Sequence, residues 1–109
     1  YFAQEDYARA VDAYQAAIKW DATVAVYHSN LGLAYARLQA WDRAIEVYRE
    51  AIRIEPAKAA HYNELANTYF NTARYREAVA ACEQAVALEP DNDLYRRNLA
   101  EARRRMGSE

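Results

Sequence analysis

The sequence predicts an all-α protein, an α-solenoid of antiparallel helix pairs, and three observations lead to that prediction. A pattern of leucine, small and aromatic residues recurs every 34 positions along the 109 residues. Alanine, the best helix former, accounts for 25 of them. Only two glycines and two prolines occur, so little interrupts long helices. A fixed period of this length is typical of proteins whose helical units stack on one another.

The repeated positions are occupied by residues of matching type. They are Tyr1, Tyr35 and Tyr69; Ala10, Ala44 and Ala78; Leu31, Leu65 and Leu99; Tyr7, Trp41 and Tyr75; and Pro56 and Pro90. This pattern resembles the tetratricopeptide repeat family, and the resemblance covers essentially the whole chain. It implies one single domain divided into a partial repeat, 1–24, two complete repeats, 25–58 and 59–92, and a last segment, 93–109.

Six helices are expected along the chain, at residues 6–20, 25–38, 41–54, 59–72, 75–88 and 93–106. The helix at 6–20 is interpreted as the second helix of the partial repeat, with residues 1–4 as a remnant of its partner. In each complete repeat, Leu, a small residue and Tyr at three- and four-residue spacing mark the first helix. Trp41 and Tyr75 begin the second helices, and Pro56 and Pro90 end them.

The last helix allows two interpretations. Arg103 replaces the repeated tyrosine, and four further arginines surround it, as expected of a polar helix that caps a solenoid. Gly107, however, lies where the family often places glycine between its two helices. Residues 93–109 are therefore either a C-terminal capping helix or the start of a further repeat.

Composition excludes several classes of function. The net charge of −2 and the pI near 5.7 argue against a nucleic-acid-binding domain. No apolar run approaches the length of a membrane-spanning helix, so no membrane insertion is expected. A single cysteine cannot form an internal disulfide. The compartment is unknown; cytoplasmic is only the default, because a targeting segment upstream would not be visible.

Neither catalysis nor metal binding is indicated, so we expect no enzyme, no catalytic residues, no metal and no cofactor. His28 and His61 have no second histidine or cysteine one turn away, as a metal site on a helix would require. Cys82 replaces an aromatic residue of the repeat and is expected to be buried and inert. No glycine-rich phosphate-binding loop is present.

The family resemblance implies that the first helices line a concave groove. Removing the core positions from those helices leaves a polar, asparagine-rich set with a few apolar residues. The candidate partner-binding groove consists of Asn30, Leu33, Asn63, Asn67, Phe70 and Asn98. A primary amide can both donate to and accept from a peptide backbone. The predicted function is a non-catalytic scaffold that binds a peptide segment of an unidentified protein, although asparagine is also an ordinary exposed helix residue.

Two further surfaces have alternative interpretations. Arg97, Arg104 and Arg105 form either a patch for an acidic partner or a solvated cap whose arginines suit the helix dipole. Val11, Tyr14 and Ile18, on a helix with little of its partner, form a possible self-association edge. The alternative function is therefore a self-association module, a homo-oligomer built through the solenoid ends.

One binding mode of the family can be excluded on its residues. Members that bind chaperone tails hold the terminal carboxylate with a clamp of Lys, Arg and Asn. In one register this clamp requires basic residues where the chain has Ala60 and Glu64, and in another it requires Lys and Asn where the chain has Ser29 and Leu33. We therefore expect no binding of such tails.

Overall fold

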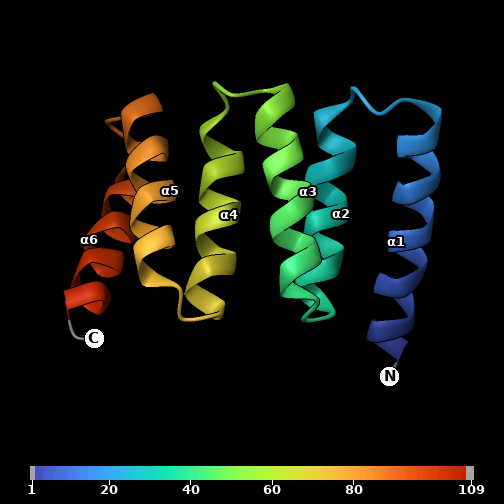
Figure 1. Cartoon of the computed structure of the whole chain (residues 1–109), viewed down its shortest axis with the longest axis horizontal. Coiled ribbons are helices and arrows are strands. Elements are labelled where there is room, and N and C mark those ends of the chain that lie inside the picture. The colour runs from blue at the N-terminus through green and yellow to red at the C-terminus, as the bar shows by residue number, and fades with distance from the viewer. Residues whose placement is uncertain (1, 108–109) are drawn as a thin grey trace. The chain divides into compact units, whose positions relative to one another are not determined.

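A computed structural model of the chain describes residues 2–107, with side chains from Gln4 onward. Every regular element in this range is an α-helix (Figure 1), which confirms the predicted all-α repeat fold. The helices are α1 (Phe2–Trp20), α2 (Ala25–Arg37), α3 (Trp41–Ile54), α4 (Ala59–Asn71), α5 (Tyr75–Leu88) and α6 (Asp93–Gly107).

The first helix is the one whose start differs clearly from the expectation. Residues 2–5 continue α1 instead of forming a separate remnant of a lost helix, while Tyr1 lies outside the described residues. No glycine or proline occurs in this stretch, and Glu5 in the first turn suits the positive end of the helix dipole. Local sequence therefore favours one continuous helix here.

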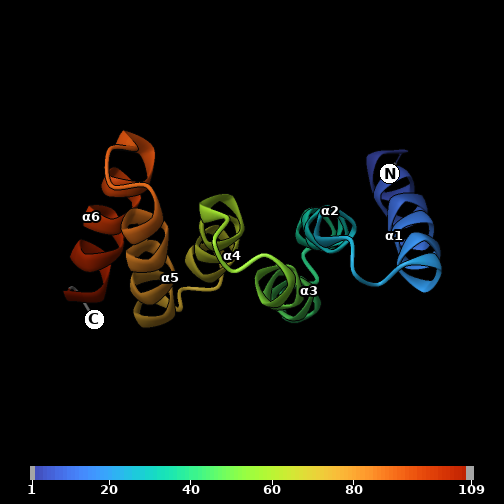
Figure 2. The ribbon, with the colours of Figure 1, turned by 90° about the horizontal axis from the view of Figure 1, so that it is seen from above.

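The chain divides into two compact units, residues 1–56 and residues 57–109. In the first unit, α2 packs against both α1 and α3, and Figure 2 shows these neighbours from above. Leu31 and Tyr35 of α2 are buried together with Ile45 and Tyr48 of α3. These buried side chains follow the helical spacing that the sequence predicts for one face of each helix.

In the second unit, α5 packs against both α4 and α6. Leu65 and Tyr69 of α4 and Leu99 of α6 are buried, and Cys82 of α5 is 1% exposed. Burial raises the pKa of the Cys82 thiol to about 11, which keeps it protonated at neutral pH. This agrees with the expectation that Cys82 is a packing residue.

Tight turns join the two helices of each pair and reverse the chain. Gln39 after α2 and Ala73 after α4 adopt left-handed backbone angles, with φ of 59° and 57°. The next amide in each turn donates back to a tyrosine carbonyl of the preceding helix: Ala40 to Tyr35 at 2.8 Å, and Arg74 to Tyr69 at 2.9 Å. Such a left-handed residue is a standard way to end a helix.

Candidate partner-binding surface

Two of the asparagines predicted to bind a partner are bonded to each other in the second unit, across α4 and α6. Asn98 Nδ2 of α6 donates to Asn63 Oδ1 of α4 at 2.8 Å, and both residues are half-buried. A primary amide carries two N–H donors and two acceptor lone pairs. The bonded pair therefore retains capacity to bond a ligand while each side chain holds the other in place.

One turn further along α4, Asn67 is exposed and Phe70 is half-buried. Asn71 Nδ2 donates to the backbone carbonyl of Asn67 at 3.0 Å, so the Asn67 side chain itself is not drawn into that bond. The Phe70 ring meets the Tyr75 ring edge-on, with centroids 6.2 Å apart and planes at 65°. This aromatic pair closes one end of the polar surface with an apolar contact.

Glu64 occupies the position of α4 that corresponds to Asn30 and Asn98. Its Oε1 lies 3.9 Å from Nδ1 of the buried His61. Burial raises the pKa of the Glu64 carboxyl group above its usual value, while His61 and Lys58 act in the opposite direction. Glu64, which interrupts the asparagine series, thus carries a partly desolvated carboxyl group close to a histidine.

The arginines of α6 are mostly engaged within the helix. Glu101 accepts from both Arg104 and Arg105, the latter at 2.6 Å. These bonds lower the pKa of Glu101 and raise that of Arg105, whose guanidinium lies 5.9 Å from the Tyr75 ring centroid. Arg97 instead donates to the backbone carbonyl of Asp93 at 3.4 Å. The negative charge of Glu101 therefore lies against Arg104 and Arg105, two of the three arginines predicted to bind an acidic partner.

The remaining candidate groove residues lie in the first unit, on α2. Asn30 is half-buried, and Leu33, three residues later, is 44% exposed. Val26, one turn before Asn30, is also exposed. These residues share one side of α2 by helical spacing, so the first unit offers a more apolar surface than the asparagine-rich one on α4 and α6.

The predicted self-association edge needs a correction. Val11 is buried at 9% exposure, and Tyr14 and Ile18 are half-buried, because α1 packs against α2. Gln15 Nε2 further ties the two helices by donating to the Tyr35 hydroxyl at 2.8 Å. The expectation of an exposed apolar strip is thus wrong for Val11, whereas self-association itself stays a prediction.

Sequence reasoning missed one exposed aromatic residue. Trp20, the last residue of α1, is 88% exposed. The repeat could have indicated that Trp20 is the last residue of its helix, since the equivalent residues Ile54 and Leu88 end α3 and α5. Exposed tryptophans are common at binding surfaces.

The described residues contain no group of three or more His, Cys, Asp or Glu side chains placed to hold a metal ion. His28 Nε2 lies 2.9 Å from the carbonyl oxygen of Ala22, so this histidine fastens the loop before α2. Within residues 2–107, none of the helices combines the length and the apolar character that a membrane crossing requires. The chemistry of the surface is hydrogen bonding, ion pairing and apolar contact.

Comparisons with known proteins establish the family. A model of the TPR repeat matches residues 1–39, and a model of the tetratricopeptide repeat matches residues 25–58 and 62–92. The chain therefore belongs to the tetratricopeptide repeat family. None of the curated protein sequences compared with the chain matches it at a significant level.

Solved structures show the same fold. The TPR domain of Arabidopsis OM64 is 26% identical, with a TM-score of 0.83 over 92% of this chain and 83% of that one. The first TPR domain of human RPAP3 is 25% identical, with a TM-score of 0.88 over 99% and 85%. The first TPR of Spaghetti, solved with the HSP90 peptide SRMEEVD, is 24% identical, with a TM-score of 0.87 over 98% and 85%.

Proposed function

We propose that the chain is a non-catalytic interaction scaffold that binds an extended peptide segment of a partner protein. The binding surface consists of Asn63 and Asn67 of α4, Asn98 of α6 and the neighbouring Phe70. In the first unit, Asn30 and Leu33 provide a second contact surface on α2. The observation that carries the proposal is the bond between the Asn63 and Asn98 amides, which joins two helices through groups suited to a peptide backbone.

The chemistry of this surface favours a peptide over a small molecule. The exposed amide of Asn67 can pair with both the N–H and the C=O of an extended chain, and Phe70 offers an apolar contact for a side chain. Ordering a flexible segment costs conformational entropy. The affinity is therefore expected to be on the order of micromolar, or about −8 kcal/mol.

Relatives support a peptide ligand without identifying it. The Spaghetti domain of the same fold was solved with a peptide bound, and interaction through helical repeats is the general use of this architecture. On this chain, the carboxylate, amide and guanidinium groups of α4 and α6 form the surface proposed to bind the peptide.

The test compares the parent chain with the Asn63→Ala/Asn67→Ala variant as baits in a lysate of the source organism, with captured proteins identified by mass spectrometry. Gln84→Ala, an exposed change on α5, serves as the control bait, and light scattering first establishes that all baits have the same mass. A protein retained by the parent and the control but lost by the variant supports the surface on α4 and α6. Equal capture by all three baits contradicts it.

Chaperone tails provide a second, negative test. The peptide SRMEEVD is bound by the Spaghetti domain. The clamp that the family resemblance implies for such tails would need, in one register, basic residues where this chain has Ala60 and Glu64. We expect no saturable binding of this peptide in fluorescence anisotropy up to about 1 mM, which corresponds to about −4 kcal/mol. Micromolar binding would show that the chain uses a different set of residues for the carboxylate.

A further inference from the structure

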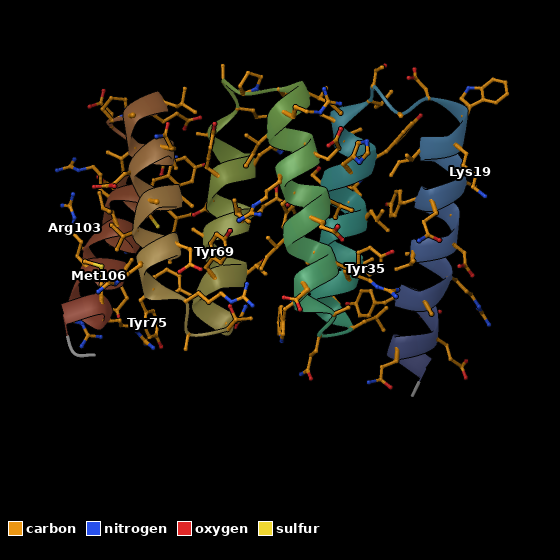
Figure 3. All side chains as sticks on the ribbon, viewed as in Figure 1. Lys19, Tyr35, Tyr69, Tyr75, Arg103 and Met106 are labelled. Carbon is orange, nitrogen blue, oxygen red and sulfur yellow. The ribbon has the colours of Figure 1, made fainter. Side chains whose placement is uncertain are left out.

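One side of α6 is exposed where the equivalent side of α2 is buried. In α2, Ala25, His28, Gly32 and Tyr35 are all buried. The residues 68 positions later on α6 are Asp93, Arg96, Ala100 and Arg103, and all four are exposed. In the first unit, Gly32 and Tyr35 on this side of α2 face Tyr48 and Arg43 of α3. We call the four α6 residues the exposed α6 face; Figure 3 labels Arg103 on it.

The exposed α6 face is hollowed and carries positive charge. Asp93, Arg96, Ala100 and the adjacent Arg97 line a surface depression. Arg96 lies 3.7 Å from Asp93, and Arg103 lies 3.3 Å from Glu83 of α5, in pairs whose side chains are all more than half exposed. Exposed pairs of this kind contribute little stability. The arginines can therefore exchange these contacts for better ones at small cost.

The first unit shows how a helix lies on the equivalent face. Two side chains of α3 lie on this face of α2: the Arg43 guanidinium is 5.9 Å from the Tyr35 ring centroid, and the Tyr48 ring covers Gly32. Glu50, two residues after Tyr48, is near enough to His28 for their charges to interact. The covering residues therefore stand at i, i+5 and i+7. On α6 the corresponding three positions to be covered are Arg103, Ala100 and Arg96.

The residue types on α6 specify what such a helix must carry. Arg103 and Arg96 call for acidic side chains at i and i+7, because opposite charges are favoured across a desolvated contact. Ala100 calls for a side chain smaller than tyrosine at i+5. A Cβ built on Gly32 lies only 2.6 Å from the Tyr48 ring, and the repeat that has Ala66 in this position carries Cys82 where the other carries Tyr48.

We propose that the exposed α6 face docks an acidic amphipathic helix of a partner protein, in the place that α3 takes on α2. The helix carries acidic residues at i and i+7 and a small apolar residue at i+5. This surface is separate from the asparagine-rich surface on α4 and α6, so the two proposals stand independently.

A second copy of the chain is a poorer occupant. The helix of this chain that would continue the repeat in a second copy is α1, and its residues at i, i+5 and i+7 are Arg9, Tyr14 and Ala16. Arg9 would then face Arg103, and the Tyr14 ring would meet Ala100. Like charge and excess volume both oppose this contact.

The test uses a synthetic peptide copied from α5, residues 75–88, whose residues at i, i+5 and i+7 are Glu77, Cys82 and Gln84. Cys82→Val and Gln84→Glu complete the required pattern, and a hydrocarbon staple on the opposite side keeps the peptide helical. Fluorescence anisotropy then measures its binding to the parent chain. Arg96→Glu should weaken binding about tenfold. Arg76→Glu, the same charge change at an exposed residue of α5, should leave it unchanged.

A charge exchange completes the test. A peptide with Glu77→Lys and Gln84→Lys should not bind the parent but should bind the Arg96→Glu/Arg103→Glu variant. Circular dichroism melting of each variant shows that it is folded. Equal binding of the acidic and lysine peptides, or no saturation up to about 1 mM, overturns the proposal. So does full competition by inorganic phosphate, which would indicate simple anion binding, or a doubled mass that Arg96→Glu abolishes, which would indicate a second copy.

Discussion

At Gly32, the packing of α2 against α3 leaves room only for a hydrogen atom. A Cβ built there lies 2.6 to 2.8 Å from three atoms of the Tyr48 ring, and Tyr48 is 2% exposed, so the ring has no free space to enter. The next repeat holds Ala66 and Cys82 at these two positions. One repeat therefore fills this space with glycine on the first helix and tyrosine on the second, and the next repeat fills it with alanine and cysteine.

This complementarity predicts strong coupling between the two positions. Gly32→Ala alone should destabilise the chain by about 1–3 kcal/mol, because it overpacks a tight contact. In a Tyr48→Cys background the same change should be neutral, or stabilising by up to about 1 kcal/mol, because alanine is the better helix former. Urea unfolding of the four variants measures the coupling. Additive effects of the two changes would contradict the contact.

At the scale of the helix, the ends of α2 and α4 carry strain that glycine would relieve. Gln39 and Ala73 have positive φ, a region in which a side chain costs about 1–2 kcal/mol. Gly107, at the same repeat position, belongs to α6 and does not have positive φ. The glycine thus stands where the structure does not use its freedom, while the two real turns are made by residues with side chains.

Ala73→Gly is therefore expected to stabilise the chain by about 0.5–1 kcal/mol, after the greater freedom of glycine in the unfolded chain is subtracted. The matched control is Ala80→Gly, an exposed position inside α5, which should cost about 1 kcal/mol. Thermal and urea unfolding measure both changes. A loss of stability with Ala73→Gly as large as that of the control would show that residue 73 does not adopt the left-handed conformation in solution.

At the scale of the whole molecule, each of the two units buries its own set of side chains. In residues 57–109 a cluster of Ala59, Ala85 and Tyr95 joins all three helices, with Tyr62 and Val86 packed against it. Stability in repeat proteins is approximately a sum of terms for each repeat and for each neighbouring pair. A destabilising substitution in the core of one unit should therefore lower the stability of that unit most.

Leu65→Ala tests this expectation. Leu65 is 7% exposed, so the change should cost about 2–5 kcal/mol in urea unfolding. Amide hydrogen exchange should accelerate in α4, α5 and α6 more than in α1, α2 and α3. Leu33→Ala, at an exposed leucine of α2, is the control and should cost far less. A loss below about 0.5 kcal/mol with Leu65→Ala would show that the assigned core register is wrong.

The sequence by itself determined the six helices and the repeated core positions. These follow from a 34-residue period and from helical spacing within it, which are properties of the chain read in order. The positions of Leu31, Leu65 and Leu99 in the core are examples. The sequence also identified Asn63 and Asn98 as polar residues outside the core, although it did not show that they bond each other.

Only the tertiary structure decided which partners the surface residues have. The bond between Asn63 and Asn98 and the burial of Val11 against α2 depend on contacts between different helices. Helical periodicity tells which side of a helix a residue occupies but not what lies opposite it. The left-handed conformation of Gln39 and Ala73 could not be predicted from the sequence for a related reason. Packing of the flanking helices imposes a backbone conformation that these residues themselves disfavour.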